Sequence, residues 1–151
     1  MYQKILVPVD GSAPSLRGLH EAARLAKGCG ASLKLVHVVN EFIFDPVYVP
    51  ATAYEPVLES MRINGQRILA TAAATAREDG VQPETQLIET IGGSVARLIL
   101  EAALQWRADL IVMGTHGRRG VSRAVLGSDA ETVLRKATVP VLFVRDHSQN
   151  P

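Results

Sequence analysis

Glycines, arginines and a serine, residue types that together can bind an anion, are concentrated between Gly114 and Ser128. They follow Asp109–Met113, an apolar run typical of a buried strand. Glycines let a backbone approach its ligand closely, arginines form charge-assisted bonds to anions, and a helix start exposes N–H groups. The order is strand, Gly-x-x-Gly, nine residues and then Gly-Ser at a predicted helix start. This spacing predicts a phosphate-binding site.

The same serine also has a purely structural interpretation. Ser128-Asp-Ala-Glu131 has the pattern of a capping box, in which the serine and glutamate bond the first N–H groups of their own helix. Arg118, Arg119 and Arg123 would then belong to a solvated loop. Gly-x-x-Gly alone is weak evidence for phosphate binding, whereas the full spacing is more specific. The two roles are compatible, because backbone N–H groups can bind phosphate while a hydroxyl caps the helix.

Predicted strands and helices alternate along the chain. Apolar runs bounded by turn residues predict strands at Ile5–Val9, Ser32–Val39, Gln86–Glu89, Asp109–Met113 and Pro140–Val144. Helical spacing predicts a helix from Pro14 to the glycines at 28 and 30, and others at about Tyr54–Glu78, Val95–Trp106 and Ser128–Ala137. Asn40–Ala53 is predicted to be a loop, one that could cover a pocket or contact a partner.

Apolar residues at helical spacing define the faces that these helices should bury. They are Leu16, Leu19, Ala22, Ala23 and Ala26, then Leu58, Met61, Ile68, Leu69, Ala72 and Ala76, then Val95, Leu98, Ile99, Ala102 and Trp106, and finally Val133, Leu134 and Ala137. Among the polar residues, His37 is expected to be a hydrogen-bonded histidine within its strand, and His20 is expected at the surface.

This order of elements predicts an α/β fold, a Rossmann-like open parallel sheet with helices on both faces, in which residues 1–151 form a single domain. Ligands of such sheets lie beyond the carboxyl ends of the strands, where the strand order reverses. Asp10-Gly11-Ser12 follows the first strand, and the glycine-rich segment follows the fourth. If those strands are neighbours, both groups lie at one crevice.

Composition limits the expected partners and location. Hydrophobic residues make up 47% of the 151 residues, as is ordinary for a soluble globular protein. The formal net charge is +1, so we expect no nucleic acid and no membrane partner. Cys29 is the only cysteine, which excludes an intrachain disulfide and favours a cytoplasmic location. Neither a signal peptide nor a membrane span is expected.

Several stretches resemble the universal stress protein family. They are Lys4-Ile-Leu-Val-Pro-Val-Asp-Gly-Ser12, Leu35-Val-His-Val-Val39, Ala108-Asp-Leu-Ile-Val-Met-Gly-Thr-His-Gly-Arg118, Leu126-Gly-Ser128 and Pro140-Val-Leu-Phe-Val-Arg145. The resemblance covers essentially the whole chain, and the spaced glycines match the nucleotide-binding branch. It implies five parallel strands in the order 3-2-1-4-5, which would place the first and fourth strands side by side.

The resemblance also implies that ATP lies in this crevice. Asp10 would bond the ribose, and the backbone of Val38 would contact the adenine edge. Adenine would be lined by Pro8, Val9 and Met113; the ribose and phosphates would be held by Gly114, Gly117, Gly127 and Ser128, with His116 and Arg118 at the mouth. Mg²⁺, where present, would be held mainly by phosphate oxygens.

One position departs from the family pattern. After Gly-Ser the family usually has an apolar residue and then a small or hydroxylated one, whereas this chain has Asp129 and Ala130. A carboxylate at a helix start favours the helix dipole by about 0.3–1 kcal/mol but repels a triphosphate unless a cation intervenes. ATP, ADP and AMP therefore all stay candidate ligands, with Asp129 beside their phosphates.

Three classes of function follow. The first is a nucleotide-binding regulatory protein of the stress response with at most slow hydrolysis, since the chain lacks a GxxxxGK[ST] P-loop and a positioned base. The second is an adenylyl- or phosphoryl-transfer enzyme using His116 or Asp10. The third is an interaction module with an empty pocket. In all three, the resemblance implies a homodimer formed through Pro140–Val144.

Overall fold

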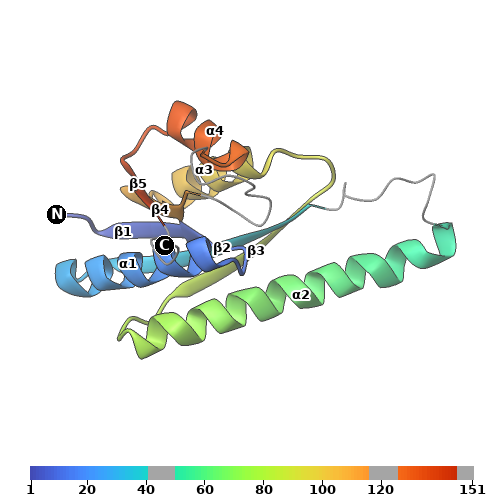
Figure 1. Cartoon of the computed structure of the whole chain (residues 1–151), viewed down its shortest axis with the longest axis horizontal. Helices are drawn as coiled ribbons and strands as arrows, with labels where there is room; N and C mark the ends of the chain where they lie inside the picture. The colour runs from blue at the N-terminus through green and yellow to red at the C-terminus, as the bar shows by residue number, and fades with distance from the viewer. Residues whose placement is uncertain (41–49, 116–125, 146–151) are drawn as a thin grey trace, which may run out of the picture.

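The computed structural model describes residues 1–40, 50–115 and 126–145. Strands and helices alternate through these ranges, as the sequence predicts (Figure 1). They are β1 (Lys4–Pro8), α1 (Ala13–Cys29), β2 (Ser32–Asn40), α2 (Ala51–Glu78), β3 (Glu84–Thr90), α3 (Val95–Trp106), β4 (Leu110–Gly114), α4 (Ser128–Lys136) and β5 (Val141–Val144).

The strands form one parallel sheet in the order β3-β2-β1-β4-β5, which confirms the predicted α/β fold. β1 is the first strand in the chain and lies in the middle of the sheet. On one side its residues Lys4–Pro8 pair with Ser32–Val36 of β2, and on the other Ile5 and Leu6 pair with Leu110 and Ile111 of β4. The strand order therefore reverses at β1 and β4, the point where open sheets of this type bind ligands.

Two helices cover each face of the sheet, and each pair closes a separate part of the core (Figure 1). Successive side chains of a strand point to opposite faces. Ile5 and Val7 of β1 accordingly pack with residues of α1 and α2, whereas Leu6 packs with residues of α3 and α4. Because both faces are covered, the middle residues of two of the inner strands are apolar, Ile5–Val7 in β1 and Leu110–Met113 in β4.

The helix termini use local signals that the sequence contains. Ser12 is the N-cap of α1, and its hydroxyl accepts a hydrogen bond from Ser15 N. The helix ends at Gly30, whose left-handed φ of 69° suits a residue without a side chain. Ser94 caps α3 in the same way as Ser12 caps α1. Within the described ranges, no helix is long and apolar enough to cross a membrane.

The predicted loop Asn40–Ala53 is wrong at both of its ends. Asn40 is the last residue of β2, and α2 already begins at Ala51 instead of Tyr54. Pro50 is the N-cap of α2 and has no side chain that can cap, so the sequence offers no start signal there. The weak third strand is also longer than predicted, with seven residues from Glu84 to Thr90.

Two residues predicted to face inward are exposed instead. Leu16 is 44% exposed, because the buried stripe of α1 runs through Ser15 and Leu19. Leu134 is 57% exposed, because Ala130 and Val133 form the buried stripe of α4.

Trp106 is half-buried and packs against the core under α3 and α4, the face on which it was predicted. Its ring lies 5.2 Å from Lys4 Nζ and 5.6 Å from Lys34 Nζ, measured to the ring centroid, and its Nε1 donates to Glu84 Oε1. Trp106 therefore joins the edge of the core to a charged cluster at the amino ends of the strands.

Candidate functional site

Because β1 and β4 are parallel neighbours, the turn after β1 and the start of the glycine-rich segment after β4 lie at the same end of the sheet, where these strands finish. The carboxyl ends of parallel strands lie at the same edge, so the two motifs meet there. Of the residues assigned to the site, His116, Gly117 and Arg118 lie outside the described residues.

Asp10 is held within the turn that joins β1 to α1. Its Oδ1 accepts a hydrogen bond of 2.9 Å from Ser12 N. Gly11, between them, has a φ of +80°, in the left-handed region that favours glycine. Asp10 therefore stabilises this turn, the structural role that aspartate often has. The same carboxylate is half-buried at the edge of the sheet where β1 and β4 end.

Side chains from two other elements fix the backbone of Val9 and Asp10. Val9 N donates to Val36 O at 2.8 Å, extending the pairing with β2 by one residue. The buried ring of His37 lies 2.7 Å from Val9 O through Nδ1; since a carbonyl oxygen only accepts, Nδ1 carries the proton. Asp10 N donates to Ser15 Oγ at 3.1 Å. His37 is thus a hydrogen-bonded histidine, as predicted.

Gly114 is required by the packing of α1 against β4. A Cβ atom at Gly114 would lie 2.6 Å from both the carbonyl carbon and the oxygen of Pro14. A Cβ atom at Gly18 would lie 3.2 Å from Gly114 N. Two glycines thus bring helix and strand into close contact. The first glycine of the motif has a structural reason to be there whether or not a ribose approaches it.

The start of α4 is joined to the end of β4. Thr115 N donates to Val144 O at 3.1 Å, and Gly127 N donates to Thr115 O at 2.9 Å. Gly127 O in turn accepts from Glu131 N, which makes Gly127 the N-cap. Because the N–H of Gly127 already has an acceptor, it is not one of the amides that can hold a phosphate in this conformation.

The predicted capping box is absent from α4. Ser128 is the first residue inside the helix, and the N-cap, Gly127, has no side chain that could cap it. The N–H groups of the first helical turn lack intrahelical acceptors, and they start at Ser128. Ser128 and Asp129 are exposed, whereas Ala130 is buried. Asp129 and Glu131 place acidic side chains in this first turn, where the helix dipole favours them.

The proposed adenine-lining residues are divided between the two faces of the sheet. Val9 belongs to the core under α1 and α2, whereas Met113 and Val38 pack with the core under α3 and α4. Pro8 is half-buried at the end of β1. The structure therefore brings together the strand ends that carry these residues but does not place their side chains on one wall.

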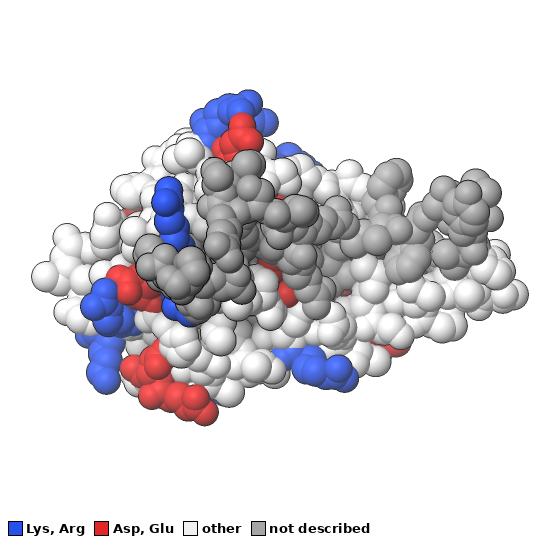
Figure 2. All heavy atoms as spheres, viewed as in Figure 1, with Lys and Arg blue, Asp and Glu red and all other residues white. Residues whose placement is uncertain are grey.

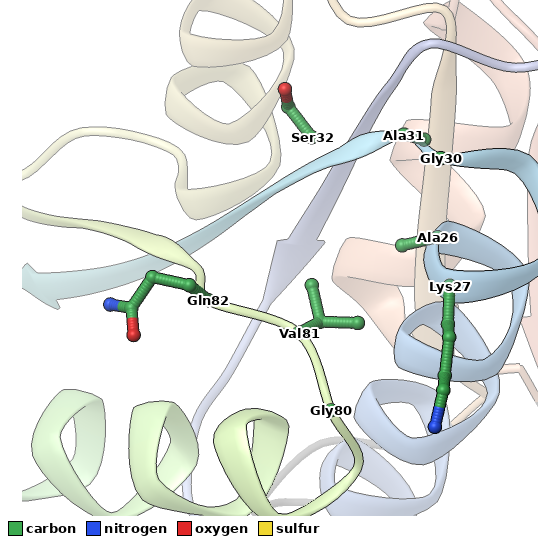
Figure 3. Close-up of a pocket in the computed structure, with 8 residues that line it drawn as sticks. All are labelled: Ala26, Lys27, Gly30, Ala31, Ser32, Gly80, Val81 and Gln82. Carbon is green, nitrogen blue, oxygen red and sulfur yellow. The ribbon is translucent and has the colours of Figure 1, made fainter.

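A pocket of about 400 Å³ lies at the opposite edge of the sheet, near the amino ends of the strands (Figure 3). It is lined by residues of the α1 C-terminus, the start of β2 and the segment before β3: Ala26, Lys27, Gly30, Ala31, Ser32, Gly80, Val81 and Gln82. It includes none of the residues that the sequence assigns to the site. Among the described residues, no group of three histidines, cysteines or carboxylates could hold a metal ion.

Sequence reasoning missed Ser15 and Pro14 as residues that shape the site. Ser15 is 7% exposed and accepts the Asp10 N–H, while Pro14 sets the approach of α1 to Gly114. The repeated serine in Ser12-Ala-Pro-Ser15 was the available signal for Ser15. The contact between Pro14 and Gly114 joins residues far apart in the chain and has no local signal.

The open parallel sheet, whose strand order reverses at β1 and β4, defines a Rossmann-like α/β protein. The chain matches the family described as the universal stress protein family over residues 1–145. It is 39% identical over 146 residues to the universal stress protein MJ0531 of Methanocaldococcus jannaschii, covering 96% of this chain and 83% of that protein. The chain belongs to the universal stress protein family.

Two solved structures of related proteins contain an adenine nucleotide. A universal stress protein in complex with cAMP is 26% identical, with a TM-score of 0.71 and coverage of 95% of this chain and 97% of the other. The universal stress protein from Archaeoglobus fulgidus in complex with dAMP is also 26% identical, with a TM-score of 0.67 and coverage of 94% and 97%. Nucleotide binding therefore occurs within the family.

Proposed function

We propose that this chain is an adenine-nucleotide-binding regulatory protein of the stress response. The observation that carries the proposal is the start of α4, whose N-cap Gly127 has no capping side chain and donates its N–H to Thr115 O after β4. β4 is the neighbour of β1, the strand that leads into the Asp10 turn. Helix N-termini bind phosphate through free N–H groups and a partial positive charge. Family members that hold cAMP and dAMP support the adenine nucleotide as the ligand class.

The two ends of the crevice favour different parts of a nucleotide. The amides from Ser128 onward suit the phosphates, with the glycine-rich segment completing their site. A carboxylate only accepts hydrogen bonds and repels phosphate, so Asp10 suits a part of the ligand that donates. The ribose of ATP, ADP or AMP offers two adjacent hydroxyl donors, and the sugars of cAMP and dAMP each keep one of them. Asp10 is accordingly the residue that binds the sugar.

Asp129 affects the choice among ATP, ADP and AMP. Its exposed carboxylate lies in the first turn of α4, next to the proposed phosphate site. Each added phosphate brings more negative charge to it, so we expect ATP to bind well only with Mg²⁺ held by the phosphate oxygens. Isothermal titration of the full chain with ATP, ADP and AMP, each with and without Mg²⁺, tests this. No heat of binding for any of the three at millimolar concentration would overturn the proposed function.

The proposed role is regulatory rather than catalytic, with at most slow hydrolysis. Rapid phosphoryl transfer requires a base that positions the nucleophile. Asp10, a candidate base within the described residues, has one carboxylate oxygen bonded to Ser12 N. A single-turnover assay with labelled ATP measures the hydrolysis directly. Turnover of one per second or faster, in the range of ordinary enzymes, would contradict a regulatory role.

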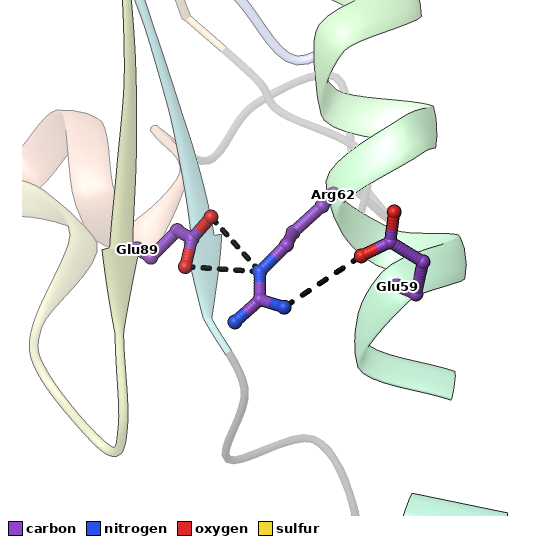
Figure 4. A network of polar contacts seen from close by, with 3 residues as sticks. All are labelled: Glu59, Arg62 and Glu89. Carbon is purple, nitrogen blue, oxygen red and sulfur yellow. Dashed lines mark hydrogen bonds and ion pairs between the residues drawn. The ribbon is translucent and has the colours of Figure 1, made fainter. Parts of the chain in front are cut away.

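The proposal includes a homodimer through the β5 edge. Val141, Leu142, Phe143 and Val144 are all apolar, and each stays half-buried within one chain. Apolar edge strands invite pairing with another strand. The opposite edge strand, β3, is different because it carries the charged residue Glu89. Arg62 of α2 forms an ion pair with Glu89 and a second, longer one with Glu59 (Figure 4). Charges at that edge disfavour pairing, so β5 is the surface proposed for the two-fold contact.

The remaining parts of the proposal are a single domain over residues 1–151, a cytoplasmic location and no nucleic-acid partner. The face shown in Figure 2 supports the last of these, since its described basic and acidic side chains occur in small mixed groups. Nucleic-acid-binding domains usually gather basic residues in one stripe or patch. We therefore expect the protein to pass through heparin resin at low ionic strength without being retained, so that no added salt is needed to elute it.

A further inference from the structure

We infer that Ser15 is a positioning residue, whose buried hydroxyl holds Asp10 in the geometry that distinguishes a ribose from a sugar without hydroxyls. This inference rests on the proposed function, in which Asp10 binds the sugar. Ser15 lies in the first turn of α1 and is 7% exposed, too buried for its hydroxyl to serve as an ordinary surface group.

Three hydrogen bonds form a closed ring in the turn between β1 and α1. Ser12 N donates to Asp10 Oδ1 at 2.9 Å, Ser15 N donates to Ser12 Oγ at 3.3 Å, and Asp10 N donates to Ser15 Oγ at 3.1 Å. Each of the three residues donates through its backbone and accepts through its side chain. The orientation of the Asp10 carboxylate is thereby tied to both serines.

Capping of α1 does not explain why a residue with a hydroxyl group stands at position 15. The cap of α1 is the bond from Ser15 N to Ser12 Oγ, and an alanine at position 15 would preserve it. The hydroxyl instead bonds Asp10 N, which lies before the helix. Without that acceptor, a partly buried N–H group would lose its partner, which proteins generally avoid. The bond therefore acts on Asp10 rather than on the helix.

A second buried side chain acts on the same peptide unit. His37 of β2 bonds Val9 O, so the peptide between Val9 and Asp10 is held at its carbonyl from β2 and at its N–H from α1. Buried polar groups are costly unless they are bonded, and here two of them converge on one peptide. This convergence fixes the direction in which the Asp10 side chain leaves the end of β1.

The expected consequence concerns sugar selectivity. A carboxylate held in one orientation can accept both hydroxyls of a ribose, whereas a carboxylate that samples several orientations accepts them less often. Hydrogen bonds to charged groups correspond to roughly 10- to 100-fold in affinity. Ser15 acts only through Asp10, so we expect Ser15→Ala to lower the preference for ATP over 2′,3′-dideoxy-ATP by about threefold or more, a part of that factor. Asp10→Asn should lower it further.

The test is isothermal titration of the full chain with ATP and with 2′,3′-dideoxy-ATP. The variants are Ser15→Ala, Ser15→Cys, whose thiol is a weak acceptor of similar size, and Ser15→Thr, which keeps the hydroxyl. Ile99→Val is the control for a small loss of stability alone. Ile99 lies in the core under α3 and α4, on the opposite face of the sheet from α1 and its three-bond ring. The Ala and Cys variants should lose selectivity, while the Thr variant and the control should keep it.

The outcomes separate this inference from the proposed function. A wild-type chain that binds neither nucleotide overturns the proposed function and the inference with it. A wild-type chain that binds both equally, or Ala and Cys variants that bind with unchanged selectivity, overturns the inference alone. An equal loss of affinity for both nucleotides also overturns it, because a purely structural role would weaken the site without changing sugar selectivity.

Discussion

Individual residues of the candidate site have structural roles in addition to the ligand-binding roles proposed for them. Asp10 holds a turn and faces the edge where β1 and β4 end, while Gly114 gives α1 room to approach β4. A residue whose type suggests ligand binding can thus also be required at its position by the packing or the turns of the fold. The most informative substitutions are therefore those that change stability and nucleotide affinity by different amounts.

Gly114→Ala should destabilise the fold directly. The added Cβ would lie 2.6 Å from backbone atoms of Pro14, which cannot move without shifting α1. We expect a loss of about 1–3 kcal/mol in the free energy of unfolding, measured with urea. The matched control is Gly28→Ala in α1, where nothing lies within 4 Å of an added Cβ. That change should stabilise the chain by about 0.4–1 kcal/mol; equal effects of the two substitutions would contradict the close packing.

Ser128→Asp should separate phosphate binding from helix stability. A carboxylate at the first position of α4 favours the helix dipole, by about 0.3–1 kcal/mol. It repels bound phosphates, so the affinity for ATP should fall more than the affinity for AMP. Asp129→Asn is the reciprocal change and should raise the affinity for ATP. Titration of both variants with both nucleotides, together with thermal unfolding, checks this; unchanged affinities would show that phosphates do not bind at α4.

Elements with strong local signals could be predicted from the sequence, whereas contacts between distant segments could not. The apolar runs of β1 and β4 and the extent of α3 were predicted because each signal lies within a few residues. The start of α2 was missed because Pro50 supplies no capping side chain. The cap of α4 was misassigned because a serine one residue inside the helix has the same pattern as a true N-cap serine.

The candidate site follows the same division. The strand order makes β1, which leads to Asp10, the neighbour of β4, which ends at Gly114, as predicted. The roles of Ser15 and Pro14 depend on how α1 docks, which no local pattern specifies. Val9 and Met113 lie on opposite faces of the sheet. Side chains alternate between the faces along a strand, so an error of one residue in the predicted register moves a side chain to the other face.

The orientation of α4 gives a prediction at the scale of one helix. Val133 is fully buried, whereas its neighbour Leu134 is 57% exposed. Val133→Ala should therefore cost about 1.5–3 kcal/mol of unfolding free energy, the value of burying such a side chain. Leu134→Ala should change it by less than about 0.5 kcal/mol, as is usual at the surface. Urea unfolding of dilute samples measures both, and a larger cost for Leu134 would mean that α4 is rotated from this orientation.

For the whole molecule, the sheet has two unequal edges. The β3 edge has an acidic residue at each end, Glu84 and Glu89, and both have partners within the chain. The β5 edge is apolar along its length. Burying β5 against a second copy would cover half-exposed side chains on both faces, since Val141 packs with α3 and α4 and Leu142 with α1 and α2.

The backbone of β5 shows which substitution tests that dimer. The carbonyl groups of Pro140 and Val144 accept bonds from β4, so the alternate residues, Val141 and Phe143, direct their backbone groups to the open edge. Val141→Pro removes one outward N–H and leaves those β4 bonds in place. We expect light scattering to show a wild-type dimer at micromolar concentration and a variant shifted toward monomer with an unchanged far-UV spectrum. A wild-type monomer, or a variant that dimerises as well as wild type, would mean that the strands do not pair across this edge.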